Sequence, residues 1–250
     1  TSRMDLTHLE LINTMEARAD EFGDRTNRYL RVSTRDVINA IGRALDDRGV
    51  PYEVEVIGGA GRKSTKHIAQ FTLDPNTDGD KFRISAWCSY NGECSTTLFG
   101  GMHRACCANG LVLGTADEEI RVRHVDNTNY DKYTKQLDDI YWAAVAILDR
   151  RVTYQQRIEA MESVKLSFVE EARIITELPV LPTVQAKVLR LRQPSMIGTL
   201  RTEDRPRNLW ALLNVVNEQL KDTKGNTANV VDINAKLTNE FVGLATKLAA

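Results

Sequence analysis

The sequence predicts an α+β protein: an antiparallel twisted sheet with helices in the N-terminal half, and a mostly helical C-terminal half. Residues 50–125 contain short runs in which apolar and polar residues alternate, as they do along half-buried strands. After residue 129, apolar residues recur instead at the spacing of one helix face. We therefore expect an acidic N-terminal helix or arm at 1–25, an α+β core with a central hairpin at 26–128, and a helical region packed on the core at 129–250.

The elements of the N-terminal half are delimited by helix-start and turn residues. Ser33 with Asp36 is typical of a helix start. Pro51 then favours an extended chain that leads into the alternating strand 52–57. A glycine-rich basic loop connects this strand to a second one at 67–73.

We expect a hairpin in the stretch from Phe82 to Leu113, where unusual residues are most concentrated. A two-residue turn at Asn91-Gly92 is one possible connection. A three-residue loop, which pairs Ala86 with Thr96, keeps the apolar residues on one face and is preferred. The buried face then consists of Phe82, Ile84, Ala86, Cys88, Cys94, Thr96 and Leu98. The opposite face carries Arg83, Ser85, Trp87, Ser89, Ser95, Thr97 and Phe99.

A short helix is expected directly after this hairpin. Gly100 and Gly101 would open it, Arg104 would lie one turn on, and it would stop at Asn109-Gly110. Exposed backbone N–H groups at a glycine-rich helix start suit a phosphate group. Two adjacent glycines equally suit a close packing contact, so both interpretations stay open.

The second half of the chain is expected to be almost entirely helical. Ser167 with Glu170 forms a capping box ahead of one of these helices. The expected helices cover residues 130–161, 172–178, 184–191, 208–221 and 233–248.

The net charge of −1 argues against a protein that coats nucleic acid with its whole surface. The charge is nevertheless unevenly spread along the chain. Residues 5–24 carry a net charge of −5, residues 58–73 carry +3 and residues 187–207 carry +4. Local basic patches on a neutral chain suit a polyanion, and ordinary solvated surface charge is the alternative interpretation.

Enzymatic signatures are weak. The cysteines and His103 do not show the spacing of a zinc site, and a Cys107–His103 nucleophile pair lacks an orienting acid. We therefore expect a binding protein more than an enzyme, with no metal and no cofactor. No apolar run approaches the roughly 20 residues of a membrane helix, and the polar N-terminus lacks a signal-peptide core. A cytoplasmic protein without membrane contacts is expected.

Two groups of motifs resemble a known family. The first consists of Ser89, Asn91, Gly92, Arg104, Cys107, Asn109 and Gly110. These residues match the Ser-x-[Asp/Asn]-Gly turn and the Arg-x-x-Cys-x-Asn-Gly segment of the phage/plasmid-type family catalogued as domain of unknown function 932. Residues 208–216 and 164–172 resemble two further segments of that family. The resemblance covers roughly residues 30–248 and implies a phage or mobile-element origin, hence the host cell cytoplasm, with no assigned activity. In outline alone, the chain is also similar to phage single-strand annealing proteins of the Red beta and RecT type.

These observations together predict a single-stranded DNA-binding protein that assists annealing or recombination as a homo-oligomer, in a ring or a filament. A guanidinium, an aromatic plane and hydroxyls on one sheet face are the groups that single strands use. The candidate residues are Arg62, Lys63, Lys66, Arg83 and Arg104 for phosphates, with Trp87 and Tyr90 for base stacking. The alternatives are a phage protein-interaction factor for anti-defence or host takeover, and a metal-dependent nuclease. If helices of the second half cover this face, Trp87 is instead a core residue.

Overall fold

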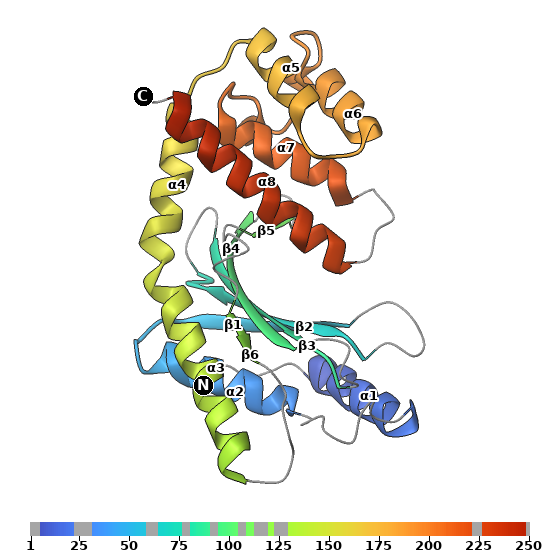
Figure 1. Ribbon diagram of the computed structural model, residues 1–250, viewed down its shortest axis with the longest axis vertical. Helices are drawn as coiled ribbons and strands as arrows, with labels where there is room; N and C mark the ends of the chain where they lie inside the picture. Colours follow the sequence, from blue (N-terminus) through green and yellow to red (C-terminus); the bar gives the residue numbers. More distant parts are fainter. Residues whose placement is uncertain are drawn as a thin grey trace. The chain divides into compact units, whose positions relative to one another are not determined.

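The computed structural model confirms the α+β fold class (Figure 1). It describes residues 6–22, 32–58, 65–76, 81–90, 95–104, 109–112, 120–122, 130–221 and 227–248. The chain divides into two compact units. The first unit comprises residues 1–103 and 118–151, and the second comprises residues 104–117 and 152–250.

The first unit is built on an antiparallel sheet, as the alternating sequence predicts. Its strands are β1 (Tyr52–Gly58), β2 (His67–Leu73), β3 (Lys81–Cys88), β4 (Thr96–Arg104) and β6 (Ile120–Val122). The first four strands pair in chain order, and β6 pairs with β4. Along β2 every second residue is buried, which is the period expected when one face of a sheet meets a core.

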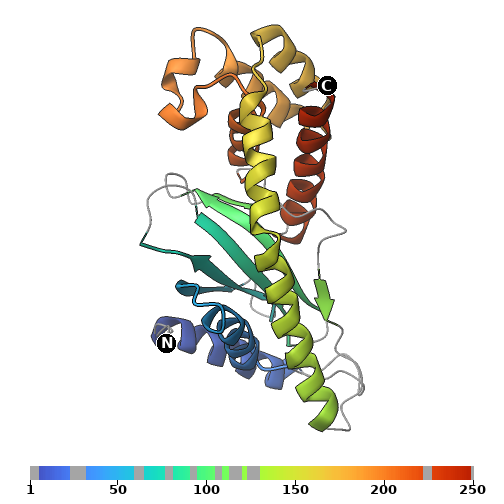
Figure 2. The ribbon, with the colours of Figure 1, turned by 90° about the vertical axis from the view of Figure 1, so that its left-hand side faces the viewer.

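Three helices complete the first unit: α1 (Leu6–Phe22), α2 (Thr34–Asp46) and α3 (Tyr130–Asp149). Helices α1 and α2 lie on the same side of the sheet (Figures 1 and 2), and α3 packs against α2, β3 and β6. Two glycines permit α1 and α2 to lie close to strand β1. A Cβ at Gly58 would lie 2.7 Å from the Cε of Met15, and one at Gly42 would lie 2.5 Å from the hydroxyl of Tyr52. We call the sheet face under these helices the inner face.

The predicted composition of the hairpin faces is confirmed, although the register differs. Phe82, Ile84, Ala86, Cys88, Thr96 and Leu98 are all buried, and Cys94 lies outside the described residues. Ala86 pairs with Leu98 instead of with Thr96. Because side chains alternate with a period of two, this shift of two residues leaves every described side chain of the hairpin on its predicted face.

The helix expected after Gly100-Gly101 was a wrong prediction. Both glycines lie inside β4, where Gly100 pairs with Ile84 and Gly101 pairs with Arg83. The ladder with β3 supplies hydrogen-bond partners as far as His103, so the chain stays extended where local composition favoured a turn. The structure therefore has no helix N-terminus at this point for a phosphate.

The second unit is mostly helical, as predicted. It contains β5 (Asn109–Val112), α4 (Arg151–Ser163), α5 (Phe168–Glu177), α6 (Pro182–Arg192), the 3-10 turns η2 (Ile197–Thr199) and η3 (Thr202–Asp204), α7 (Leu209–Lys221) and α8 (Thr227–Leu248). The single helix expected over 130–161 is two helices, α3 and α4, interrupted at Arg150. None of the described helices is long and apolar enough to cross a membrane.

The start of α5 is held by the predicted capping box. The Ser167 hydroxyl accepts a hydrogen bond from the Glu170 backbone N–H at 3.2 Å, and the Glu170 carboxylate accepts one from the Ser167 N–H at 2.7 Å. Hydrogen bonds from the side chain and the backbone of Ser167 hold the pKa of the Glu170 carboxyl below its ordinary value. The helix therefore starts at Phe168, four residues earlier than expected.

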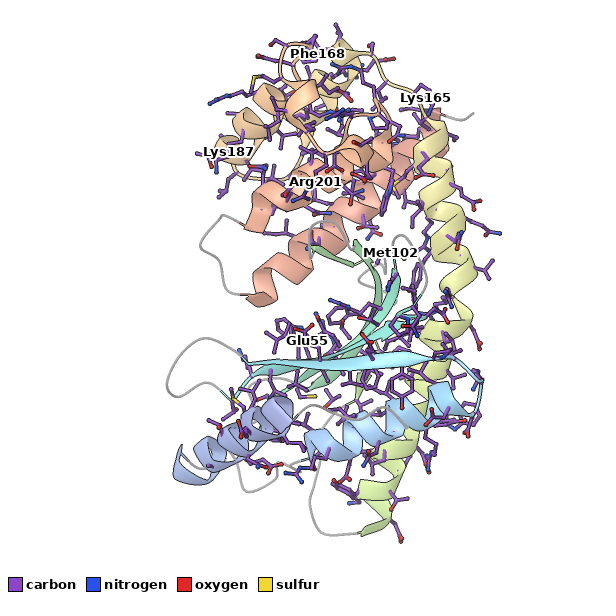
Figure 3. The ribbon with its side chains drawn as sticks, turned by 180° about the vertical axis from the view of Figure 1, so that it is seen from behind. Glu55, Met102, Lys165, Phe168, Lys187 and Arg201 are labelled. Atoms are coloured by element: carbon purple, nitrogen blue, oxygen red, sulfur yellow. The ribbon has the colours of Figure 1, made fainter. Side chains whose placement is uncertain are left out.

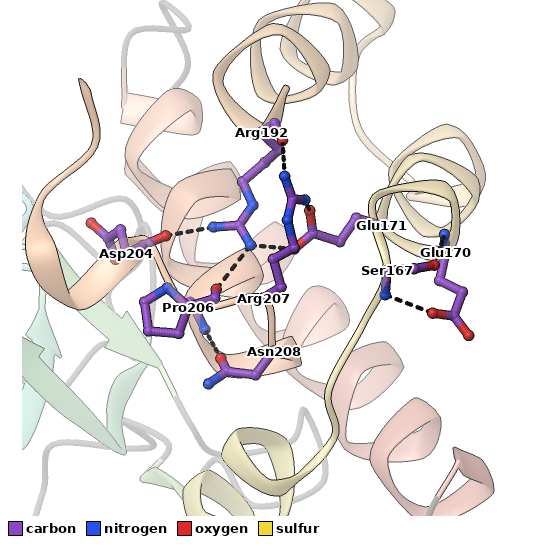
Figure 4. Close-up of polar contacts among 9 residues, drawn as sticks. Ser167, Glu170, Glu171, Arg192, Asp204, Pro206, Arg207 and Asn208 are labelled. Carbon is purple, nitrogen blue, oxygen red and sulfur yellow. Dashed lines mark hydrogen bonds and ion pairs between the residues drawn. The ribbon is translucent and has the colours of Figure 1, made fainter. Parts of the chain in front are cut away.

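An ionic cluster lies in the interior of the second unit (Figure 4). Glu171 of α5 is fully buried and accepts hydrogen bonds from both Arg192 and Arg207. Arg192, also fully buried, donates to the carbonyl of Asp204 at 2.5 Å and to that of Pro206 at 2.9 Å. Arg207 donates to the carbonyl of Arg192 at 3.0 Å. This Glu171 cluster joins α5, α6 and the η3–α7 segment.

Candidate nucleic-acid interface

The sheet has a polar outer face, opposite to the inner face that α1 and α2 cover. The register places on it the odd-numbered residues of β1 and β3 and the even-numbered residues of β2. Glu55 lies on this side of β1, turned away from α1 and α2 (Figure 3). The outer face is therefore the surface on which the sequence placed the candidate arginine and tryptophan.

Five residues form a line across the outer face, which we call the Trp87 row. Ile57 pairs with Ile68, Ile68 with Trp87, Trp87 with Thr97, and Thr97 with Arg121. Ile57 and Arg121 at the two ends are exposed, and the three residues between them are half-buried. The row thus offers an apolar and aromatic surface that ends at an exposed guanidinium.

Trp87 is the centre of this row and the best-placed candidate for stacking. Its indole Nε1 is covered and has no hydrogen-bond partner among the described residues. Buried donors in folded proteins almost always have a partner, so this N–H is one of a few exceptions among the described residues. Lys66 directly precedes β2, two residues before Ile68 of the row, and is half-buried.

Arg83 is held within the outer face and is only 9% exposed. Its Nε donates to Thr72 Oγ1 at 3.1 Å, and its Nη1 donates to Gln70 Oε1 at 2.7 Å. Burial lowers its pKa, while the charge of Glu55 opposes that shift. Arg83 therefore acts as a fixed charge under the surface and does not reach out to a phosphate.

Tyr90 is fully buried, so it presents no ring for base stacking. Its hydroxyl donates to Thr34 Oγ1, accepts from the Thr34 N–H at 3.2 Å and lies 3.4 Å from a Glu16 carboxylate oxygen. Its ring lies 4.9 Å from that of His67. Burial raises the pKa of Tyr90, which keeps the hydroxyl protonated as a donor. The side chain is a structural part of the inner face.

His67 completes this inner-face group, which we call the His67 cluster. Its Nε2 lies 2.5 Å from Thr34 Oγ1, and its Nδ1 lies 2.8 Å from the carbonyl of Thr65. Because a carbonyl only accepts, Nδ1 carries the proton and Nε2 accepts from the threonine hydroxyl. Burial lowers the pKa of His67 to about 4, so the ring is neutral at physiological pH.

Most of the remaining candidates lie outside the described residues. Arg62 and Lys63 lie outside the described residues, and so do the side chain of Arg104 and the motif residues 91–92. The basic segment 187–207 is neutralised in part, because Arg192 and Arg207 share Glu171, and Arg201 lies 2.9 Å from Glu218. Lys187 and Arg190 of this segment are exposed.

Sequence reasoning missed Ile57, Ile68 and Arg121 as members of the outer face. Ile57 and Ile68 alternate with apolar neighbours in their strands, so the pattern that could have identified them is in the sequence. Strand β6 is only three residues long, so it gives little pattern for Arg121. Pairing between β4 and β6 is a long-range contact, which a local pattern does not reveal. The row could therefore be recognised only once the register was known.

Two curated proteins of Escherichia coli strain K12 are similar to this chain, UPF0380 protein YafZ and UPF0380 protein YfjQ. Each is 25% identical over 148 residues, which make up 59% of this chain and 51% of the relative. The chain thus spans about half the length of the curated relatives it matches. No solved structure matches the chain.

The family model matches residues 21–241, which include most of both compact units and leave out nearly all of α1. The resemblance carried by the hairpin and helix motifs therefore extends through most of both units. The chain belongs to the family described as Domain of unknown function (DUF932).

Proposed function

We propose that this protein binds single-stranded DNA across the Trp87 row and promotes annealing or recombination as a homo-oligomer. The observation that supports the proposal best is the row itself, in which an indole and two isoleucines lead to an exposed arginine. Single strands bind to surfaces that combine base stacking with nearby cations. The same proposal assigns a phage or mobile-element origin and a cytoplasmic location.

The charges of the outer face favour one path for the strand. Glu53 and Glu55 are exposed on β1 and would repel phosphates. Arg121 lies on β6, at the opposite end of the Trp87 row from β1. Lys66 lies two residues before Ile68 of the row. We infer that the phosphates run near Arg121 and Lys66 while bases stack on Trp87. Arg83 would add a fixed positive potential beneath them.

Binding of a labelled oligonucleotide tests this proposal. The affinity should fall by about tenfold or more as salt rises from about 50 to about 200 mM, because phosphate contacts release counterions. Replacing Trp87→Leu should weaken binding by about tenfold, the usual effect of losing one stacked base. Arg121→Gln should reduce the slope of log affinity against log salt by about 0.7. Complementary oligonucleotides should anneal faster with the wild-type protein than without it.

Val169→Ala is the control, because Val169 is an exposed apolar residue on α5 and lies outside the row. It should leave the oligonucleotide affinity unchanged. If the folded protein binds no oligonucleotide at low salt, or if Trp87→Leu and Val169→Ala bind equally weakly, the proposal is wrong.

A protein-binding role is the second candidate, and one observation favours it. The centre of the outer face is covered, since Arg83, Ser85 and Phe99 are each at most 9% exposed. A face of this kind presents less polar surface to a nucleic acid than an open platform does. This role would be supported if the wild-type protein binds no oligonucleotide and Trp87→Leu nevertheless abolishes its activity in the cell. Cleavage of the oligonucleotide that a chelator abolishes would instead indicate a metal-dependent nuclease.

A further inference from the structure

A preorganised aromatic group lies on the surface of the first unit, away from the Trp87 row. Trp142 on α3 is 62% exposed, and its ring meets Tyr141 edge to face at 5.1 Å and 86°. The Arg43 guanidinium lies 4.9 Å from the centre of the Tyr141 ring. Tryptophan, tyrosine and arginine are the residues most enriched at the energetic centres of protein interfaces.

We call the exposed side of α3 around Trp142, with Tyr141 and Arg43, the Trp142 surface. Polar contacts hold its side chains in place, and its net charge is negative. The Tyr141 hydroxyl donates to Asp47 at 2.9 Å, and Arg43 lies 3.5 Å from Asp138. One exposed side of α3 carries Lys135, Asp138, Asp139, Trp142 and Asp149, at helical spacing, for a net charge of −2. A partner that covers Trp142 would therefore have to be cationic.

A cationic counterpart exists on the second unit of the same chain. From Leu178 to Thr202 the sequence contains no acidic residue. Within this stretch, α6 buries Val184 and Val188 on one side. Its exposed side, which we call the α6 face, carries Thr183, Ala186, Lys187 and Arg190. Figure 3 labels Lys187 on this helix. Small side chains next to two cations suit an indole ring, because cations bind the face of tryptophan best of all aromatic rings.

We propose that the Trp142 surface of one copy docks on the α6 face of a second copy of this chain. The two surfaces are complementary in charge and are different parts of the molecule, so the contact is heterologous. Such a contact repeats from copy to copy and builds a closed ring or an open filament. The inference rests on the homo-oligomer part of the proposed function and names the surfaces that make the oligomer.

Light scattering on the full chain, without DNA, tests this contact. Trp142→Ala and Arg190→Glu should each lower the association constant by at least about tenfold, as central interface residues do. Asp139→Lys should do the same by placing a cation against the α6 face. The double variant D139K/R190E should recover association, because the two reversed charges again face each other. Lys236→Glu, an exposed charge reversal on α8, is the control and should change nothing.

The outcomes separate this inference from the DNA-binding proposal. A wild-type chain that stays monomeric at every concentration overturns it, and so does a double variant no better than D139K and R190E alone. If Arg190→Glu weakens oligonucleotide binding and leaves the mass unchanged, the α6 face is a nucleic-acid surface and the inference is wrong. If Trp87→Leu has no effect on DNA while Trp142→Ala dissociates the oligomer, the contact stands and the DNA-binding proposal fails.

Discussion

The two compact units each bury a polar cluster, and the two clusters solve the problem of burial differently. The His67 cluster of the first unit is made of neutral groups, a threonine, a histidine and a tyrosine that exchange hydrogen bonds. The Glu171 cluster of the second unit is ionic, with one carboxylate between two guanidinium groups. A neutral cluster depends on the protonation state of its histidine, whereas an ionic cluster depends on every charged partner being present.

Removing the carboxylate from the ionic cluster should have the largest effect. Glu171→Gln leaves Arg192 and Arg207 without their counter-ion, one of them fully buried. We expect the second unit to lose about 3–5 kcal/mol of unfolding free energy, the usual result when one partner of a buried pair is removed. Trp210 is the only tryptophan of that unit, so its fluorescence in a W87F/W142F background reports the urea transition.

Glu177→Gln is the control for this prediction. Glu177 pairs with Arg173 one turn away, and both side chains are largely exposed. Pairs of this kind contribute about 0.3–0.5 kcal/mol, so the transition should hardly move. Equal shifts for Glu171→Gln and Glu177→Gln would show that the buried cluster does not stabilise the unit.

Lowering the pH should reduce the unfolding free energy of the first unit more than that of the second. The pKa of His67 is about 4 in the folded protein and 6.5 in its ordinary state, so the unfolded chain binds the proton more tightly. The stabilisation of the first unit by the neutral His67 ring is therefore complete above pH 6.5 and is lost as the pH falls towards 4. The first unit should lose about 3 kcal/mol over this range, measured by urea unfolding with Trp87 and Trp142 as reporters.

The second unit provides the internal comparison for the same titration, because its cluster contains no histidine. Its transition, followed through Trp210, should change less over the same pH range. His67→Gln should flatten the pH dependence of the first unit at the expense of some stability. A first unit that is equally stable at pH 7 and pH 4.5 would contradict the assignment of a neutral buried imidazole.

Removing one hydroxyl from the neutral cluster should have an intermediate effect. Tyr90→Phe leaves the Thr34 N–H without its acceptor and Thr34 Oγ1 without a donor. An unsatisfied buried group costs about 1–3 kcal/mol, and the ring itself is kept. The midpoint of the first unit's urea transition should fall accordingly. Tyr141→Phe, which removes an exposed hydroxyl bonded to Asp47, is the control and should have a smaller effect.

Local sequence patterns predicted much of the fold, including the hairpin of the first unit and the capping box at the start of α5 in the second. Alternation identified the two hairpin faces, since Phe82 and Leu98 are buried as expected. The Ser167–Glu170 box was visible because capping depends on four consecutive residues. Signals confined to one element were therefore sufficient for these features.

The rest depended on contacts between distant segments. Gly100 and Gly101 look like a helix start locally, yet pairing with β3 extends them. Tyr90 looked available next to a turn, but its partner Thr34 lies 56 residues away. The Trp87 row needs the register of five strands, and a register is not encoded in any one of them.

The smallest expected effect links local structure back to the ionic cluster. Ser167→Ala removes the hydroxyl that caps α5 and should cost about 1 kcal/mol. Ser163→Ala is the control, because among the described residues that exposed hydroxyl bonds only to the carbonyl of Ala160. Since α5 presents Glu171 to both arginines, the cap and the cluster should be coupled. The double variant S167A/E171Q should then lose less stability than the two single losses added together. Additive losses would mean that the cluster fixes Glu171 without help from the cap.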